Sequence, residues 1–513
     1  MASVRLVYVG RMAFVSPRAA GQQFRDSMEV EWRETEAASK ENGWQAQQRT
    51  HRDRLHWNDV DVLTGEEVMC FFSGYGPRVH QALTAQGHTV SVEDRRPCGL
   101  HAPDFQAIRG TTFRGRQAEG MANMLASRGG LVLASTGYGK SFTVRTLARL
   151  FPLDIGIVTA PSTTNARDLY NALKDSIPDL GFVGDGHNKP DRVTVAVTHS
   201  LHHCDQNASW CLVDEAHMAC AAIHVQKLIK LQRAKMFALT ASGKRPDGRD
   251  GYLEAIFGPT LLDVEYGEAV ASGNVVQIRV TLLPIRKGPD VDGMTDKTAK
   301  DKMALWRNLH RNQTIADATL ERIARHPEAQ VLVMVDKTEH AFRLGQLLPG
   351  FTVVHGDLPK DRLKQLISLK AFDPKTQIVC DKKALRTHQL AFTEGRLRHV
   401  IATGIWSRGV DFKDLNLLVR ADGLGSIIAA DQIPGRLSRL GSDGQKPYGE
   451  MLDCVDFFSR CMLGRALTRL SIYGKNEFEL DPASVALKKE ASSIYRNRGK
   501  RLAGLPSDEE PIE

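Results

Sequence analysis

Short apolar segments alternate with helix-like segments along two stretches of this chain. In the first half, apolar runs typical of strands lie near 131–134, 155–159, 193–197, 210–213 and 236–240. In the second half, comparable runs lie near 331–335, 352–355, 376–380, 399–403 and 416–421. Strands that alternate with helices favour parallel sheets covered by helices on both faces. The pattern therefore predicts an α/β protein with two such lobes in tandem.

A separate region precedes the first alternation. Residues 1–105 contain strand-like stretches at 4–9, 67–72 and 89–92 and a polar, helix-like run around 22–48. Acidic residues slightly outnumber basic ones here, so nucleic-acid binding by this region requires basic side chains gathered on one face. We expect a small α+β N-terminal accessory domain, with nucleic-acid binding as a candidate role.

Polar and glycine-rich segments indicate where the domains divide. The run from Lys287 to Gly293 has the composition of a linker or loop. We therefore expect the first lobe over 106–280, the second over 281–465 and a helical tail over 466–513. The tail gathers basic residues around Tyr495, namely Lys488, Lys489, Arg496, Arg498, Lys500 and Arg501. It fits a phosphate-binding arm and an exposed solubilising helix equally well.

Composition narrows the class of protein. The 513 residues include 68 Lys and Arg against 60 Asp and Glu, which gives a net charge of +8. This mild excess agrees with a nucleic-acid partner without requiring one. No apolar run is long enough for a transmembrane helix, the first residues lack a signal-peptide pattern, and the eight cysteines form no C-x-x-C pair. We expect reduced thiols, a cytoplasmic location and no membrane partner.

Residues 134–141 read ASTGYGKS, which fits a phosphate-binding loop between a predicted strand and a predicted helix. Small residues let backbone N–H groups close around phosphates at the start of a helix. We expect Thr136, Gly137 and Gly139 to line a bound nucleotide. Lys140 would reach the β- and γ-phosphates, and the hydroxyl of Ser141 would hold Mg²⁺.

A second cluster follows the apolar run at 210–213, which ends in Asp214, Glu215, Ala216 and His217. Two adjacent carboxylates at the end of a buried strand are costly unless a cation or a reaction uses them. We expect Asp214 to bind Mg²⁺, directly or through water. Glu215 would orient and deprotonate the attacking water. An acidic corner between strand and loop is the alternative without chemistry.

The run from Asp214 to His217 spells the DEAH box, and the chain resembles the superfamily 2 helicases and translocases over about 105–460. The resemblance implies two tandem RecA-like parallel-sheet lobes, ATP and Mg²⁺ as cofactors in a cleft between them, and nucleic acid as the partner. Further family motifs follow in order: an adenine-recognition element at Phe113 to Gln117, motif Ia at Thr159 to Pro161, motif III at Thr240 to Ser242, motif V from Thr403 to Asp411, and motif VI from Gln432 to Arg439.

The first-half motifs imply binding roles. Phe113, Arg114 and Gln117 would recognise adenine, because the amide of Gln117 can both donate to and accept from one edge of the base. Either Phe113 or Arg116 could cover the base face, since the family often has an aromatic residue where Arg116 stands. Motif III, with Thr240 and Ser242, would couple the nucleotide site to the strand path, and a polar turn is its structural alternative.

Other motif residues would bind the strand or the nucleotide. Thr159, Pro161, Ser162 and Thr403 would contact the strand, although Ser162 also fits an ordinary helix cap. Motif V would bring Gly409 and Asp411 to the nucleotide.

Motif VI offers two arginines for catalysis, Arg436 and Arg439. They are three residues apart, so on a helix they would share one face. A guanidinium can pair with two phosphate oxygens, and one supplied by the second lobe would neutralise the transferring phosphoryl group only in the closed state. The resemblance favours Arg439 at the γ-phosphate, with Arg436 as the other candidate. The alternative without a catalytic role is a basic helix face exposed to solvent.

The layout is similar to the phage UvsW-type recombination helicases, with a leader, compact lobes and a short basic tail. That resemblance implies ATP-driven remodelling of branched or single-stranded DNA in recombination and repair: fork or junction unwinding, branch migration, R-loop removal and annealing. It also implies the cytoplasm of a bacterium or of a phage-infected host. Residues 358–383 exceed the family's usual length and fit either a substrate-contacting insertion or an extra surface helix and strand.

Three other functions fit the same motifs. The chain could be an RNA helicase, or a duplex DNA translocase that does not separate strands. It could also be a non-catalytic nucleic-acid-binding scaffold, although the intact Lys140, Asp214, Glu215, Arg436 and Arg439 argue against decay of the ATPase.

Overall fold

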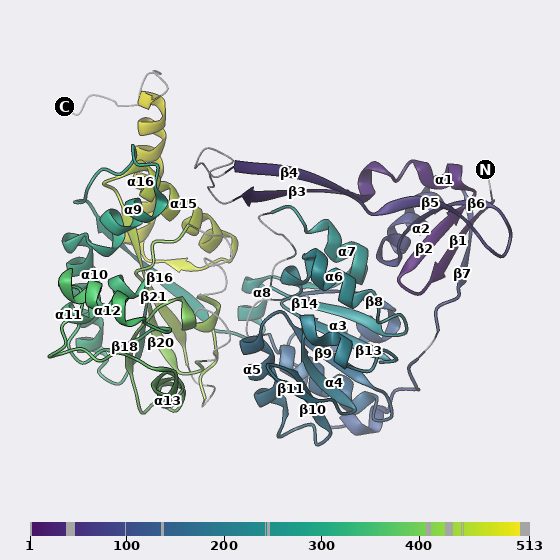
Figure 1. Cartoon of the computed structure of the whole chain (residues 1–513), viewed down its shortest axis with the longest axis horizontal. Helices are drawn as coiled ribbons and strands as arrows, with labels where there is room; N and C mark the ends of the chain where they lie inside the picture. Colours follow the sequence, from purple (N-terminus) through teal and green to yellow (C-terminus); the bar gives the residue numbers. More distant parts are fainter. Residues whose placement is uncertain are drawn as a thin grey trace. The chain divides into compact units, whose positions relative to one another are not determined.

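The computed structural model describes residues 3–36, 47–97, 99–134, 138–241, 243, 247–406, 412–425, 434–442, 444 and 446–502. The chain divides into two compact units, Met1–Glu265 and Tyr266–Glu513 (Figure 1). The division comes earlier than the expected boundary at 280. The segment from Lys287 to Gly293, expected as the break between lobes, is instead a loop inside the second unit.

The first unit contains an eight-stranded sheet of order β11-β10-β12-β9-β13-β14-β8-β15. All neighbours are parallel except the β10–β11 hairpin. The five strands expected from the apolar pattern are confirmed, and β10, β11 and β15 are additional. The bounds are β8 (Gly129–Ala134), β9 (Gly156–Ala160), β10 (Leu180–Gly184), β11 (His187–Lys189), β12 (Val193–Val197), β13 (Trp210–Asp214), β14 (Lys235–Thr240) and β15 (Thr260–Val264).

Helices cover this sheet and give it a core on both faces (Figure 1). The central strands are uninterrupted apolar runs because both of their faces are buried; the side chains of β13 from Trp210 to Val213 are 0% exposed. The helices are α3 (Gln117–Ala126), α4 (Lys140–Leu150), α5 (Thr163–Leu173), α6 (Ala222–Leu228) and α7 (Gly251–Phe257).

The second unit contains a seven-stranded sheet of order β18-β19-β17-β20-β21-β16-β22, parallel throughout. Two tandem lobes built on parallel sheets confirm the predicted fold class. The bounds are β16 (Gln277–Ile285), β17 (Gln330–Met334), β18 (Thr352–Val354), β19 (His399–Ala402), β20 (Leu415–Arg420), β21 (Tyr448–Asp456) and β22 (Glu479–Leu480).

One expected strand, at 376–380, is wrong. Ile378 is 85% exposed, and side-chain hydrogen bonds replace a ladder: Gln377 Nε2 donates to Phe342 O at 2.7 Å, and Cys380 N donates to His355 Nε2 at 3.1 Å. The segment 358–383 therefore holds the surface helix α12 (Lys360–Ser368) and the start of α13 (Lys382–Thr393), but no strand.

The helices of the second unit surround a fully buried ionic cluster at the carboxyl ends of β20 and β21. The pairs are Arg311–Asp456 at 2.9 Å, Arg420–Asp422 at 2.7 Å and Arg469–Asp453 at 2.8 Å, with side chains at most 3% exposed. Breaking one such pair would leave a buried charge uncompensated. The remaining helices are α8 (Tyr266–Ala271), α9 (Lys297–Asp301), α10 (Leu309–Arg325), α11 (Thr338–Leu347), α15 (Arg460–Lys475) and α16 (Pro482–Leu502). Among the described residues, none of the helices is both long and apolar enough to span a bilayer.

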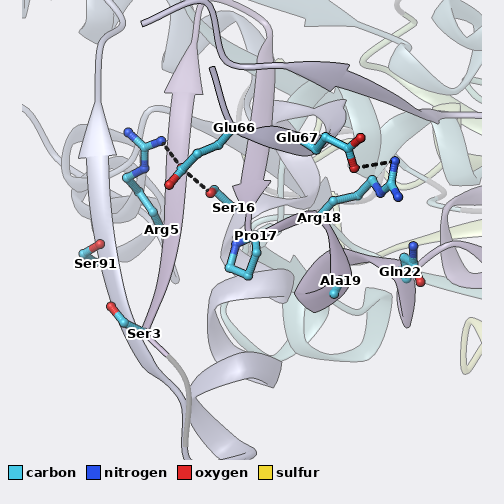
Figure 2. A pocket seen from close by; sticks show the side chains of 10 residues that line it. All are labelled: Ser3, Arg5, Ser16, Pro17, Arg18, Ala19, Gln22, Glu66, Glu67 and Ser91. Atoms are coloured by element: carbon cyan, nitrogen blue, oxygen red, sulfur yellow. Dashed lines mark hydrogen bonds and ion pairs between the residues drawn. The ribbon is translucent and has the colours of Figure 1, made fainter. Parts of the chain in front are cut away.

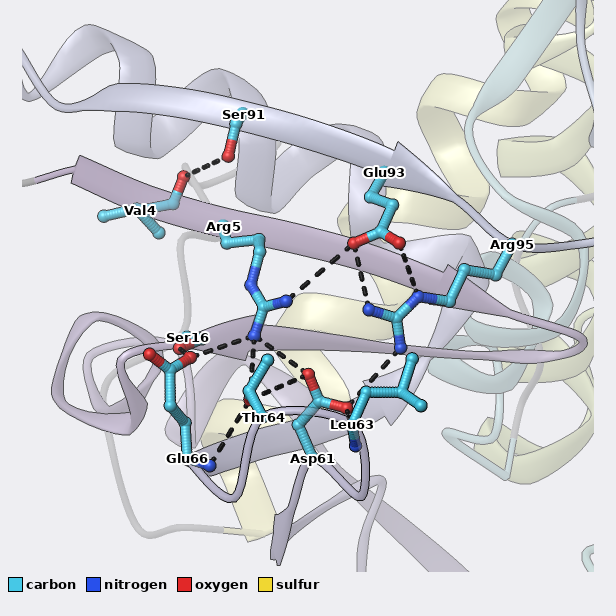
Figure 3. Close-up of polar contacts among 10 residues, drawn as sticks. All are labelled: Val4, Arg5, Ser16, Asp61, Leu63, Thr64, Glu66, Ser91, Glu93 and Arg95. Atoms are coloured by element: carbon cyan, nitrogen blue, oxygen red, sulfur yellow. Dashed lines mark hydrogen bonds and ion pairs between the residues drawn. The ribbon is translucent and has the colours of Figure 1, made fainter.

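The N-terminal region, expected as a small α+β domain, has a sheet of its own within the first unit. Its sheet has the order β5-β6-β2-β1-β7, with β1 and β7 parallel and the other pairs antiparallel. Figure 3 shows Arg5 joining Asp61 and Glu66, both at 2.9 Å, across one face of this sheet. The elements are β1 (Ser3–Val9), β2 (Met12–Ser16), α1 (Arg18–Gln22), β5 (His56–Val60), β6 (Glu67–Phe72), α2 (Gly76–Ala85) and β7 (Thr89–Asp94).

The helical run expected around 22–48 is wrong, because β3 (Glu29–Glu36) and β4 (Gln47–Arg54) form an antiparallel hairpin there. Trp32 of β3 stacks on His51 of β4 with ring centroids 4.1 Å apart. Arg249 lies 3.5 Å above the Trp32 ring, so the hairpin packs against the segment before α7. Cross-strand pairing with a distant partner overrode the local helical pattern.

Candidate nucleotide-binding site

The phosphate-binding loop has the predicted strand–loop–helix context. Strand β8 ends at Ala134 and α4 begins at Lys140. Gly139 precedes the helix with φ of +113°, a backbone conformation that favours glycine, and a Cβ there would lie 2.6 Å from Gln117 Nε2 and displace that side chain. The predicted nucleotide residues Thr136 and Gly137 lie outside the described residues.

Lys140 meets both predicted carboxylates. Its Nζ lies 2.9 Å from Asp214 Oδ1 and 2.6 Å from Glu215 Oε1. These residues converge because β8 and β13 are separated only by β14 in the sheet, and parallel strands bring their carboxyl ends to one edge. The Lys140 and Ser141 positions at the start of α4 therefore share one edge with the DEAH-box carboxylates.

The electrostatics of this cluster are unbalanced. Burial disfavours the charge of Lys140, but the two carboxylates outweigh it and raise the pKa of its ammonium. Burial raises the pKa of Asp214, and the neighbouring charge of Glu215 adds to that effect while Lys140 opposes it. One ammonium thus neutralises two carboxylates, in a position where a further cation would be stabilised.

Glu215 has a strained backbone conformation, and the turn that follows it contacts the end of β14. Its φ is +47°, in the left-handed region that a non-glycine residue adopts at a cost of about 1–3 kcal/mol. His217 Nδ1 lies 3.5 Å from Glu215 Oε2 and 3.0 Å from Thr240 Oγ1 at the end of β14. These contacts link the corner at Asp214 and Glu215 directly to Thr240 at the end of β14, a connection that sequence spacing did not reveal. Ser242 lies outside the described residues.

The adenine-recognition residues lie beside the loop. The Gln117 amide accepts from Arg114 N at 3.0 Å and donates to Tyr138 O at 2.6 Å, so it would have to exchange these partners to bind a base edge. Arg116 pairs with Glu119 at 2.7 Å. Phe113 packs edge-on against Phe142 at 5.3 Å and carries no competing polar group, which favours it over Arg116 for covering a base.

Two of the residues expected to contact nucleic acid make hydrogen bonds within the protein. Thr159 is 0% exposed and its Oγ1 lies 3.0 Å from Thr198 Oγ1, so its hydroxyl is used inside the core. Ser162 caps α5 by accepting from Asn165 N at 3.2 Å, which confirms the capping alternative. Pro161 lies between them in the turn after β9. Thr403 is buried, and its backbone N–H donates to Val354 O.

Motif VI does not form the expected helix. Pro434–Arg436 is a short 3-10 turn, and Arg439 follows it in irregular structure, so the shared helix face predicted for the two arginines is wrong. Proline and glycine at 434 and 435 explain the tight turn. Arg436 is 9% exposed and Arg439 is half-buried. Gln432 of this motif, and Gly409 and Asp411 of motif V, lie outside the described residues.

A lysine that the sequence gave no reason to single out fixes this turn. Lys446 Nζ donates to Leu437 O and to Leu415 O, both at 2.5 Å. Val276 N donates to Ser438 O at 2.8 Å from the neighbouring strand end. Because these bonds come from distant parts of the chain, no local motif could have predicted them.

The N-terminal domain has a pocket of about 740 Å³, shown in Figure 2. Its arginines already face carboxylates: Arg5 donates to Glu66 at 2.9 Å, and Arg18 pairs with Glu67 at 2.8 Å. Ser16 Oγ donates to the same Glu66 at 2.6 Å. The pocket therefore lacks the unbalanced positive charge that would favour a phosphate, and it does not support nucleic-acid binding here.

Comparison with known proteins gives one sequence relative. No protein-family model matches the chain. The chain is 24% identical over 245 residues to the DNA 3'-5' helicase XPB of Mycobacterium tuberculosis. The match covers 46% of this chain and 39% of that relative, so the chain spans well under half of the relative's length.

Several solved structures are similar at low identity. They include an HsdR fragment of a type I restriction enzyme from Vibrio vulnificus (16% identity, 78% of this chain and 74% of that chain, TM-score 0.47). S. cerevisiae Dbp5 bound to RNA and ADP BeF3 is 16% identical; the match covers 78% of this chain and 98% of that chain, with a TM-score of 0.49. T4 UvsW is 16% identical; the match covers 93% of this chain and 98% of that chain, with a TM-score of 0.39. TM-scores this low carry no information about function.

Proposed function

We propose that this protein is an ATP-dependent DNA helicase or translocase that remodels branched DNA. The observation that carries the proposal is the convergence of Lys140, Asp214 and Glu215 at the carboxyl edge of a parallel sheet, directly after a glycine with positive φ. A lysine at the start of a helix, beside two carboxylates at a strand end, is the arrangement that phosphoryl transfer from a nucleotide requires.

Each residue of the cluster has a distinct proposed role. Lys140 binds nucleotide phosphates, for which it exchanges the carboxylates it contacts in this structure. Glu215 accepts the proton of the attacking water, and its strained backbone holds the carboxylate in place for that task. His217, placed between Glu215 and Thr240, transmits the state of this corner to the end of β14.

The cluster also fits a divalent cation. The Lys140 ammonium already occupies a position between the two carboxylates, which demonstrates that positive charge is stabilised there. Asp214 and the hydroxyl of Ser141 would supply the oxygen ligands that Mg²⁺ prefers. Bound there, Mg²⁺ would neutralise charge on the phosphates.

DNA is the proposed substrate for two reasons. The sequence relative is a DNA helicase by name, and the layout of leader, lobes and basic tail resembles the phage recombination helicases. An RNA helicase and a duplex translocase share the same nucleotide chemistry, so the site alone does not separate them from the proposal.

The test is ATP turnover measured without nucleic acid and with single-stranded DNA, duplex DNA, a four-way DNA junction and RNA. The strongest stimulation is expected with forked or four-way DNA, and none is expected in Glu215→Gln. Stronger stimulation by RNA would change the assignment to an RNA helicase. Turnover that does not depend on Glu215 under any condition would leave a nucleic-acid-binding scaffold.

Arg439→Ala is expected to lower nucleic-acid-stimulated ATP turnover by about ten- to hundredfold. The loss should fall short of the roughly 10³-fold or more attributed to an arginine finger, because Arg436, three residues earlier in the chain, is the second candidate for the same role. Steady-state phosphate release checks this. Arg398→Ala is the control, since that arginine is exposed, belongs to the same unit and pairs only with surface Glu328 in the interactions observed for it. An unchanged rate in Arg439→Ala would move the role to Arg436.

A further inference from the structure

The basic charge of this chain is concentrated in two adjacent helices. By sequence, α15 and α16 together contain ten Lys and Arg and one acidic residue, Glu490, whereas the whole chain has a net charge of only +8. Three of these charges are already paired: Arg469 with buried Asp453, Arg465 with Asp301 at 2.6 Å, and Glu490 with Arg286 at 2.7 Å. The excess of positive charge on the two helices attracts a polyanion.

The two helices pack against each other (Figure 1). Ser484 of α16 accepts from Leu282 N of β16 at 2.7 Å, and Ala491 is fully buried. Tyr495 lies against Gly464 of α15, where a Cβ would be 3.0 Å from its ring. The described part of the tail is therefore a docked helix rather than a free arm, and its basic residues have fixed positions.

A pocket of about 480 Å³ opens where α15 meets α16. The side chains that matter for binding are Arg460, Arg465 and Thr468 from α15 and Tyr495 from α16, with Asp292 and Gly425 at the rim. Arginine, a hydroxyl and an aromatic ring are the groups that bind the backbone and bases of nucleic-acid strands.

The acidic residues near this pocket are already satisfied. Asp292 accepts from Ser459 Oγ at 2.6 Å and from the backbone N–H groups of Arg460 and Cys461, both at 2.8 Å, so it caps α15. Asp301 pairs with Arg465 at 2.6 Å. Among the described residues, neither carboxylate forms an ion pair with the guanidinium of Arg460.

Arg460 is held in place but not satisfied. Its guanidinium lies 4.5 Å from the centre of the Tyr495 ring, which fixes its orientation. Its Nε is buried and has no hydrogen-bond partner among the residues that the structure describes. An arginine positioned by an aromatic ring, with an unused N–H donor, is suited to donate hydrogen bonds to a phosphate.

We propose that this α15–α16 pocket binds a backbone phosphate of a nucleic-acid strand, at a site outside the helicase motifs. The inference rests on the proposed function, because it assumes that the chain handles nucleic acid. It adds a specific contact made by Arg460, with the ring of Tyr495 beside it. The hydroxyl of Thr468, which donates to Gly464 O at 3.1 Å, lines the same pocket.

The pocket also adjoins the segment that precedes motif VI in the sequence. A Cβ at Gly425 would lie 2.9 Å from Arg465 Cγ, and Arg469 Nη1 donates to Leu424 O at 3.2 Å. A strand bound at Arg460 would therefore lie near Leu424 and Gly425, which follow β20 in the chain.

The test is binding of a fluorescently labelled DNA strand and an RNA strand of the same sequence to the full chain, over a series of salt concentrations. Arg460→Ala is expected to weaken the binding of both strands by about three- to tenfold. It should also reduce the slope of log affinity against log salt concentration by about 0.7. Tyr495→Ala should weaken the binding of both strands to a similar degree, because it removes the ring that orients Arg460. Lys475→Ala is the matched control, because it removes one charge from the exposed end of the same helix, away from the pocket.

The outcomes separate the pocket from the general function. An equal loss of strand affinity in Arg460→Ala and Lys475→Ala would overturn the site. The binding would then depend only on the overall positive charge of the helices. Tight binding by the unaltered chain with no loss in Arg460→Ala would overturn the pocket while leaving the proposed function intact. Binding of neither strand by the unaltered chain, together with ATP turnover indifferent to nucleic acid, would overturn both. Thermal unfolding of each variant identifies any loss caused by misfolding.

Discussion

Replacing Glu215 by Gln is expected to lower ATP turnover by roughly 10²–10⁴-fold, the range that a positioned general base contributes. The substitution keeps the shape of the side chain and an oxygen that can still accept from Lys140, which now lies 2.6 Å from Oε1. It removes the proton acceptor. ATP binding should therefore persist while hydrolysis stops, as measured by binding of a fluorescent ATP analogue alongside phosphate release.

Glu119→Gln is the matched control for that experiment. Glu119 belongs to the same unit and pairs with Arg116 at the surface, so its neutralisation should leave turnover within about twofold of the original, as for most surface changes. Turnover in Glu215→Gln close to that of the control would contradict the assignment of Glu215 as the base. The proton would then have to leave through another group at this edge of the sheet.

The sequence predicted the fold well where burial is continuous. Strands such as β13 are buried on both faces, so an unbroken apolar run identifies them without knowledge of their neighbours. The same rule failed at 376–380, where an apolar run includes the 85% exposed Ile378 and hydrogen bonds to side chains. It also failed at β3 and β4, because the pairing of Trp32 with His51 depends on residues distant in sequence.

The candidate site was predictable in its residue types but not in its connections. Lys140, Asp214 and Glu215 follow from spacing, because a strand, a turn and a helix fix their positions locally. The contact of His217 with Thr240 depends on which strands are neighbours in the sheet, and that order is not encoded in local pattern. The role of Lys446 under the motif VI turn is equally non-local.

Buried side chains also changed roles assigned by motif. A threonine after a strand reads as a phosphate contact, yet Thr159 uses its hydroxyl inside the core. Whether a polar group faces solvent or a neighbouring strand depends on the register of the sheet, which residue type alone cannot supply. Residues whose chemistry is costly to bury, such as paired carboxylates, were for that reason more reliable guides than hydroxyls.

Replacing Lys140 by Ala is expected to abolish ATP turnover and to weaken ATP binding by at least about 10²-fold, since a charge-assisted phosphate contact is lost. It should also destabilise the fold. Asp214 and Glu215 have side chains only 15% and 19% exposed, and the variant leaves both without their ammonium, at a cost of about 2–4 kcal/mol.

That destabilisation has a defined pH dependence. Burial and the neighbouring carboxylate already raise the pKa of Asp214, and removal of Lys140 raises it further. A carboxyl group with a raised pKa binds its proton more tightly in the folded than in the unfolded chain, so folding is favoured at low pH and loses stability as pH rises through the folded pKa. The deficit of Lys140→Ala relative to the original chain should therefore shrink as pH falls through the raised pKa of Asp214 toward the ordinary value of an aspartate, about 4.

A double variant separates the loss of charge compensation from any general damage. Adding Asp214→Asn to Lys140→Ala removes one of the two uncompensated carboxylates, so it should restore part of the stability at pH 8 without restoring ATP binding. Chemical denaturation of the single and double variants at several pH values measures this coupling. If Lys140→Ala were as stable as the original chain at pH 8 and still bound ATP, the ammonium would be neither the counter-ion of these carboxylates nor the phosphate ligand. The proposed nucleotide site would then lose the residue on which its chemistry depends.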